Sequence, residues 1–262
     1  MHFCLSRGLK VLPGPEEEAV KIVDALYDEV GATGGTLPHR EVPPIIGIEA
    51  LLEMKEAGFP AWAEVEWGGY YLKFLLQKLC GDVLSGVAEP LDLSHKRHFI
   101  KGDYVWDAHL SAEDKNEVPL GAVDEYADII EANDGIGVLI ADAYVQKDET
   151  GEFKHFQEDM KGGLSEYDIK AAMEGKPPQP RKEAFFIRKV YAYFFTPADL
   201  ESGIQNRWAK NSFQRTMKNS NDSRRGGKYS IKIDSIPKEY LLFVKNFNED
   251  AKEFGDEFPE FN

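Results

Sequence analysis

The spacing of apolar residues predicts several amphipathic helices along the chain. From Ala19 to Val30 apolar residues recur at helical spacing, and Pro13-Gly14-Pro15 stands before them. Glutamates at positions 16–18 fall in the first turn of this helix, where they complement its dipole. Similar patterns predict helices at about Ile48 to Glu56, Trp62 to Cys80, Ala122 to Asn133 and Ser165 to Met173. A further helix is expected to begin near Pro197 and run into the basic segment, and a last one to run from about Lys238 into the acidic tail.

Shorter apolar runs between the helices predict β-strands. Ile136–Ala141 is a continuous apolar run, which is typical of a strand buried on both faces. A turn at Lys147–Gly151 joins it to a predicted strand over Glu152–Phe156. Further strands are expected as two extended segments between about Val87 and Leu110, at Ala184–Phe195 and at Tyr229–Ile233.

These elements predict an α/β fold with a central mixed β-sheet flanked by helices and with helical elaborations. We find no internal repeat and no clean linker, so we expect a single domain over residues 1–262. Its N-terminal part, residues 1 to about 60, is expected to be helical.

Composition places the chain among globular proteins of a reducing compartment. Hydrophobic residues make up 42% and charged residues 29%, which is ordinary for such proteins. The two cysteines, Cys4 and Cys80, have no metal-ligand spacing. No apolar run reaches the roughly 18 residues of a membrane span, and the N-terminus lacks the apolar core of a signal peptide. We therefore expect a cytoplasmic protein with no membrane partner.

The charge of the chain is divided unevenly along the sequence. The net charge is -15, but residues 205–232 hold eight basic residues and one acid, a local charge of +7 that leaves -22 elsewhere. Such a division is typical of a surface that binds a polyanion on an otherwise acidic protein. The sequence therefore predicts a DNA-binding region at about 197–232, with a solvated, lysine- and arginine-rich loop as the alternative.

Two acidic residues lie on neighbouring predicted strands. Pro90-Leu91-Asp92 belongs to the first extended segment and Asp107-Ala108-His109 to the second. Because side chains two apart share a strand face, His109 is expected beside Asp107. Two carboxylates so placed can hold Mg²⁺, which lowers the pKa of a bound water and stabilises charge on a phosphodiester oxygen. The alternative is that both acids are ordinary strand-end or surface residues.

In these residues and in its helix–strand–strand–helix–strand order, this segment resembles the active-site region of the PD-(D/E)XK nucleases, the superfamily of most type II restriction endonucleases. The family pattern is a proline-aspartate pair followed by an acid, any residue and a lysine. The resemblance implies that Asp92 and Asp107 are Mg²⁺ ligands. It also implies a contribution to the site from Glu64 or Glu66 on the preceding helix.

The chain departs from that pattern at two positions. Leu91 separates the proline from the acid, and His109 stands where the lysine is expected. A lysine gives a fixed positive charge near the attacking water, a role that a histidine fills only as a cation or a proton acceptor. Lys101 or another lysine is an alternative source of that charge.

A second stretch strengthens the resemblance. Sequence similar to that found downstream of the catalytic strands in restriction enzymes covers residues 151–163 (GEFKHFQEDMKGG), Ser165, Tyr167 and Arg181-Lys182. Lys161, with the two glycines after it, offers a cation and backbone N–H groups to a phosphate. In the hairpin implied here Asp142 would lie opposite Glu158, which makes this carboxylate pair a competing metal site.

These patterns together predict a Mg²⁺-dependent endonuclease that hydrolyses double-stranded DNA at a specific sequence and works as a homodimer. The residues expected to contact DNA are Lys161, Arg207, Lys210, Arg215, Lys218, Arg224, Arg225 and Lys228. Trp208 lies among them and is expected either to stack on a base or to pack a helix. The alternatives are a non-catalytic DNA-binding protein with a degenerate nuclease site and an acidic structural or interaction protein.

Overall fold

The computed structural model describes residues 14–32, 42–83, 100–112, 116–164, 166–175, 180–213 and 227–248. Its α-helices are α1 (Pro15–Ala32), α2 (Gly47–Glu56), α3 (Trp67–Val83), α4 (Val123–Ala132), α5 (Glu152–Lys161), α6 (Glu166–Met173) and α7 (Pro197–Gln205). Its 3-10 helices are η1 (Pro60–Ala63), η2 (Ile233–Ser235) and η3 (Lys238–Tyr240). Its strands are β1 (Ile45–Ile46), β2 (Ile100–Lys101), β3 (Val105–Ala112), β4 (Glu117–Ala122), β5 (Ile136–Lys147), β6 (Lys182–Phe195), β7 (Ala209–Phe213), β8 (Gly227–Lys232) and β9 (Leu241–Asn246).

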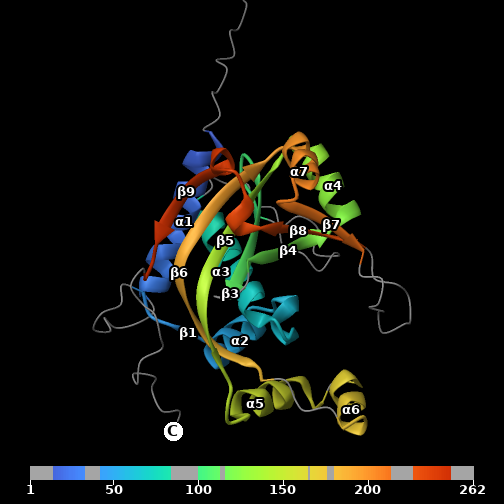
Figure 1. The fold of residues 1–262 in the computed structure, drawn as a ribbon. Coiled ribbons are helices and arrows are strands. Elements are labelled where there is room, and N and C mark those ends of the chain that lie inside the picture. Colours follow the sequence, from blue (N-terminus) through green and yellow to red (C-terminus); the bar gives the residue numbers. More distant parts are fainter. Residues whose placement is uncertain are drawn as a thin grey trace, which may run out of the picture.

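A mixed sheet forms the centre of the molecule (Figure 1). Its strands follow the order β1-β6-β5-β3-β2, and β9 also pairs with β6. β3 and β5 run parallel, with α4 in the connection between them, and the other pairs in this sheet are antiparallel. The α/β fold with a mixed sheet flanked by helices, predicted from the sequence, is confirmed.

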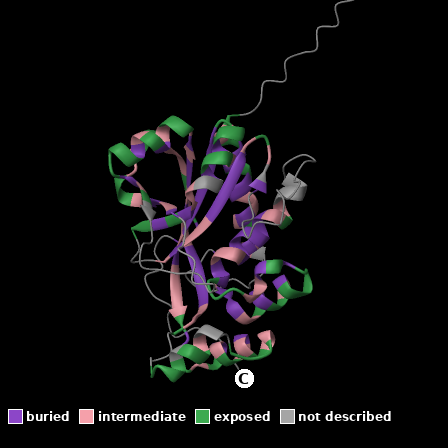
Figure 2. Cartoon of the chain, turned by 90° about the vertical axis from the view of Figure 1, so that its right-hand side faces the viewer, coloured by how far each residue is buried: buried purple, intermediate pink, exposed green. Residues whose placement is uncertain are grey.

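Both faces of the central sheet are covered. Alternate residues of β5 belong to different hydrophobic clusters: Leu139 and Ala141 pack with α1, α2 and α3, whereas Val138 and Ile140 pack with α4, α7 and the smaller sheet. This explains the unbroken apolar run in the sequence, since a strand between two layers needs apolar side chains on both faces. Figure 2 shows the buried residues concentrated along the strands.

A second sheet of three strands, in the order β4-β8-β7, lies beside the central sheet (Figure 1). β8 pairs antiparallel with both neighbours. Trp208, just before β7, is buried and packs against Phe195 and Tyr240. Of the two roles expected for Trp208, the structure therefore favours packing in the core.

Two expected elements are wrong, and a third is shorter than expected. Residues 152–161 form α5 rather than a strand, because Asp148 accepts hydrogen bonds from the backbone N–H groups of Gly151 and Lys154 and so caps a helix. Residues 241–246 form β9 rather than a helix. The helix that begins at Pro197 ends at Gln205, so the basic segment continues as β7.

Other expectations fall outside the described residues. These are the first extended segment, including Asp92, and the basic residues Arg215, Lys218, Arg224 and Arg225. None of the described helices combines the length and the apolar character needed to cross a bilayer.

Candidate catalytic and phosphate-binding site

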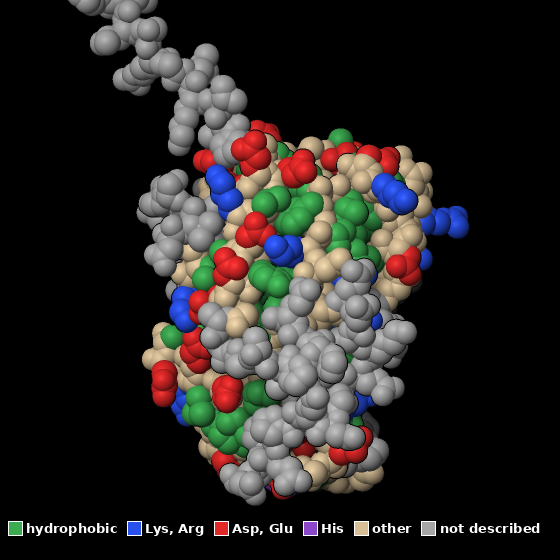
Figure 3. Space-filling model, turned by 90° about the vertical axis from the view of Figure 1, so that its left-hand side faces the viewer, with side chains coloured by type: hydrophobic (Ala, Val, Ile, Leu, Met, Phe, Trp, Pro, Cys, Tyr) green, Lys and Arg blue, Asp and Glu red, His purple; other side chains and the backbone are tan. Residues whose placement is uncertain are grey.

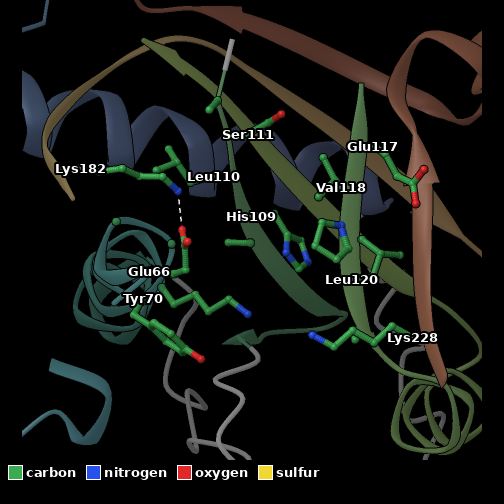
Figure 4. Close-up of a pocket in the computed structure, with 17 residues that line it drawn as sticks. Glu66, Tyr70, His109, Leu110, Ser111, Glu117, Val118, Leu120, Lys182 and Lys228 are labelled. Atoms are coloured by element: carbon green, nitrogen blue, oxygen red, sulfur yellow. Dashed lines mark hydrogen bonds and ion pairs between the residues drawn. The ribbon is translucent and has the colours of Figure 1, made fainter. Parts of the chain in front are cut away.

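A pocket of about 560 Å³ opens where α3, the edge of β3, β4 and the start of β8 meet (Figure 4). β2 pairs only with Val105 and Trp106, so within the described residues the rest of β3 has no strand on that side. Lys73 of α3 reaches Asp107 of β3, whose side chain lies on the face of the sheet that carries α4. The pocket therefore lies where the two layers of the molecule meet.

Asp107 is fully buried beside this pocket, and its carboxylate accepts hydrogen bonds from both layers. The Lys73 ammonium, from α3, donates to Oδ1 at 2.5 Å, and the backbone N–H of Ala108 donates to the same oxygen at 2.9 Å. The Tyr126 hydroxyl, from α4, donates to Oδ2. The Nε2 atom of His109 lies 2.8 Å from that second oxygen. Both carboxylate oxygens are thus occupied.

The charge of Asp107 is fixed by these neighbours. Burial by itself raises the pKa of this carboxyl group, but the charges of His109 and Lys73 and their hydrogen bonds outweigh burial. The pKa of Asp107 is therefore held well below its usual range. Asp107 consequently acts as a permanent acceptor at neutral pH.

His109 lines the pocket while Asp107 holds its ring. The two residues share one face of β3. Their register partners on β5 are Val138 and Ile140, which pack on the side of the sheet that carries α4. Because Nε2 faces the carboxylate, Nδ1 is the ring nitrogen left to exchange a proton with a pocket ligand. A carboxylate that fixes the orientation and tautomer of a histidine prepares it for general acid–base chemistry.

The remaining charged groups that line the pocket are two lysines, Lys182 and Lys228, and two acids, Glu66 and Glu117. In Figure 4 the Lys228 side chain points toward His109 from β8, and Lys182 stands on the opposite wall, where it pairs with Glu66. Glu117 is paired with Lys210 at 2.5 Å and also accepts from Ser230. The first turn of α3, with its partial positive charge, borders the same space. Since each of the two acids is paired with a lysine and α3 presents its positive end, the pocket can take an anionic ligand such as a phosphate.

Comparison with known proteins gives no relative. No protein-family model, no curated protein and no solved structure matches the chain.

The structure brings together some of the residues expected at the site and separates others. Asp107 and His109 are adjacent as predicted. Glu66 lines the pocket but is ion-paired with Lys182, and Glu64 is exposed outside it.

The predicted DNA contacts are also divided. Lys228 lines the pocket, Lys210 is paired at its rim, and Arg207 is exposed just before β7. Lys161 lies at the end of α5, away from the pocket, and burial together with the charge of Arg181 lowers its pKa.

The prediction of a competing metal site at Asp142 and Glu158 is wrong. The Asp142 carboxylate accepts both of its hydrogen bonds from Arg188, at 2.8 and 2.7 Å. Glu158 belongs to α5, whereas the strand position opposite Asp142 is Lys189 on β6. The carboxylate pair inferred from a hairpin is therefore not formed.

Two members of the site were not anticipated from the sequence. Lys73 is the only charged residue in the stretch Tyr70–Leu76, whose other members are apolar or aromatic. A single lysine on a helix face that should be buried signals a partner charge in the interior. Tyr126 gave no comparable signal, since an aromatic residue is ordinary on an amphipathic helix.

Proposed function

We propose that this protein is a nuclease that hydrolyses phosphodiester bonds of DNA in the pocket beside β3. The observation that carries the proposal is the buried Asp107 carboxylate that orients His109 toward a pocket lined by Lys73, Lys182 and Lys228. Such a pocket combines a group that can move a proton with a cation, Lys228, that can neutralise a phosphate.

The chain's own residues account for the main steps of the reaction. Nδ1 of His109 takes a proton from a water molecule as the water oxygen bonds to phosphorus. The bond from phosphorus to one sugar oxygen breaks, and the departing oxygen keeps the electron pair and takes a proton from solvent. Lys228 neutralises the charge that builds up on the phosphate oxygens. Lys73 supports the site indirectly, since it keeps Asp107 ionised.

The resemblance also implies Mg²⁺, and the described residues do not fit that ion as placed. Asp107 has both oxygens occupied, and the described part of the chain contains no group of three potential metal ligands. Asp92, the second ligand expected, lies outside the described residues. Mg²⁺ binding therefore stays a prediction.

The region that holds the DNA is proposed to be β7, β8 and the segment 214–226 between them. Phe213 of β7 pairs with Gly227 of β8, the neighbour of Lys228 in the pocket lining. We further propose, by analogy with enzymes that cut palindromes, that the protein works as a homodimer on double-stranded DNA, and that it acts in the cytoplasm.

Supercoiled plasmid provides the test. Purified protein is incubated with plasmid in the presence of Mg²⁺ or EDTA, and nicked and linear forms are measured. Wild type is expected to cut the plasmid. The cutting rate of His109→Gln is expected to be at least about 100-fold lower, because a general base usually contributes a factor of this size. Lys238→Gln is the control, because Lys238 is exposed and does not line the pocket. Equal rates for wild type and His109→Gln would show that His109 is not the base.

A non-catalytic DNA-binding protein is the second candidate. The complete engagement of Asp107 by Lys73, His109 and Tyr126 favours it, since a carboxylate used only for structure would have such partners. This candidate predicts salt-sensitive binding to duplex DNA with no cutting under either metal condition.

A further inference from the structure

We infer that the pocket accepts one whole nucleotide, with its phosphate beside His109 and Lys228 and its base against an apolar wall. This inference rests on the proposed function and specifies which part of the substrate enters the site. It follows from the size of the pocket, from the division of its lining and from its glycine border.

The pocket is larger than a phosphate needs. Its volume of about 560 Å³ falls within the roughly 300–1,000 Å³ typical of sites that enclose small organic molecules. A site for the phosphate backbone alone would need only cations at the surface, because phosphate contacts can be made without burying the base.

The lining is divided between polar and apolar groups. His109 and Lys228 point toward each other in the middle of the pocket (Figure 4). Leu110 stands on one side of His109, and Val118 and Leu120 of β4 stand on the other. Apolar side chains bring nothing to the binding of a bare phosphate, whereas they remove the faces of a base from water.

A glycine keeps the helix side of the pocket open. Gly69 lines the pocket from the first turn of α3, and a Cβ atom added there would have no neighbour within 4 Å. Tyr70, the next residue, also lines the pocket and offers an aromatic ring to a base. A larger side chain at position 69 would therefore extend into open space beside the pocket without disturbing the core.

For a duplex to place a whole nucleotide here, one nucleotide must leave the base stack. Enzymes that act in this way extrude the nucleotide into a fitted pocket at a cost of a few kcal/mol for unstacking. We therefore expect isolated mononucleotides to bind to the same pocket, independently of any cutting activity.

The experiment compares deoxynucleoside 5′-monophosphates, inorganic phosphate and deoxynucleosides by calorimetric titration of the full-length protein. A mononucleotide is expected to bind at least tenfold more tightly than phosphate or nucleoside alone. Lys228→Gln and Gly69→Leu should each weaken mononucleotide binding at least fivefold, and Lys238→Gln should leave it unchanged. Circular dichroism of each variant verifies that it is folded.

Two results would overturn the inference: equal binding of phosphate and mononucleotide, or unchanged mononucleotide binding by Gly69→Leu. These outcomes are separate from those of the plasmid assay. Cutting without mononucleotide binding leaves the nuclease proposal standing and removes the nucleotide pocket. Mononucleotide binding without cutting leaves the nucleotide pocket standing and removes the nuclease proposal.

Discussion

Asp107 joins the two layers of the molecule at a single side chain. Lys73 approaches its carboxylate from α3, and Tyr126 approaches it from α4. The buried ammonium of Lys73 would have no compensating charge without this carboxylate, so the pair is more important for stability than a surface ion pair. The same carboxylate also orients His109, which makes its structural and functional roles inseparable in an Asp107 variant.

Asp107→Asn is expected to destabilise the protein by about 3–5 kcal/mol at neutral pH, because it leaves Lys73 as a buried charge without its partner. The pKa of Asp107 is lowered in the folded state, so its contribution is complete above the unfolded pKa of about 3.9 and is lost as the pH falls toward the folded value. Urea unfolding of both proteins at neutral and acidic pH measures the difference, which should shrink in acid.

The matched control for this change is Asp24→Asn, which removes a more exposed partner from Lys245. It should cost no more than about 1 kcal/mol. A cost for Asp107→Asn no larger than that of the control would contradict the buried pair.

Glu66→Gln separates two roles for Glu66. The resemblance suggests that Glu66 helps to hold Mg²⁺. In that case Glu66→Gln should lose the cutting activity. The structure pairs Glu66 with Lys182, so the substitution releases an ammonium group to the pocket ligand. We expect DNA affinity to rise by up to about fivefold, the equivalent of about 1 kcal/mol for an exposed pair. Anisotropy titration and plasmid cutting measure both effects, with the exposed Glu64→Gln as the control.

At the site, contacts between residues close in sequence could be predicted, and contacts between residues far apart in sequence could not. Asp107 and His109 were expected to be neighbours because strand side chains alternate with a period of two. Their contact with Lys73 joins positions 34 residues apart, and no periodicity encodes such a contact. The isolated lysine in an apolar helix face was the available signal, but it identifies no partner.

At the scale of elements, α3 must lie close to the sheet for Lys73 to reach Asp107. Gly68 permits this approach, because a Cβ atom there would lie 2.8 Å from Cδ2 of Leu110 and 3.0 Å from Cε1 of Phe185. Gly69, its neighbour, faces open space. Two adjacent glycines in one helical turn therefore have different reasons to be glycine.

Gly68→Ala is expected to destabilise the protein by about 1–3 kcal/mol through overpacking. Gly69→Ala should be neutral or stabilise it by up to about 1 kcal/mol, because alanine favours the helix and meets no neighbour. Thermal unfolding of the two variants in parallel makes the comparison. A similar loss in both would contradict the packing of α3 on the sheet described above.

Elements with a strong hydrophobic pattern were predicted well, and those set by local capping were not. β5 and β6 have long apolar runs and were recognised, as was α4. For α5 the turn-like sequence before Gly151 suggested a hairpin, although Phe153, Phe156, Gln157 and Met160 already follow helical spacing. β9 was missed because its strand conformation depends on pairing with β6, which is distant in sequence.

At the scale of the whole molecule, the β7–β8 region beside the pocket carries several basic residues. Arg207, Lys210 and Lys228 belong to the β7–β8 region. Seen from the opposite side, the molecule shows acidic and basic side chains interspersed with apolar ones (Figure 3). The net charge of -15 therefore does not oppose DNA binding at this one region.

Arg207 gives the sharpest test of that region, because it is exposed and its backbone is left-handed, with φ at 67°. Asparagine tolerates this conformation, so Arg207→Asn removes a charge without adding backbone strain. If Arg207 contacts one phosphate, the slope of log K against log salt for duplex DNA should become shallower by about 0.9. Anisotropy titrations over a series of KCl concentrations measure the slope, and Lys238→Gln should keep the wild-type value. Because counterion release depends on the number of phosphates neutralised, a slope unaltered by Arg207→Asn would place the DNA on another surface.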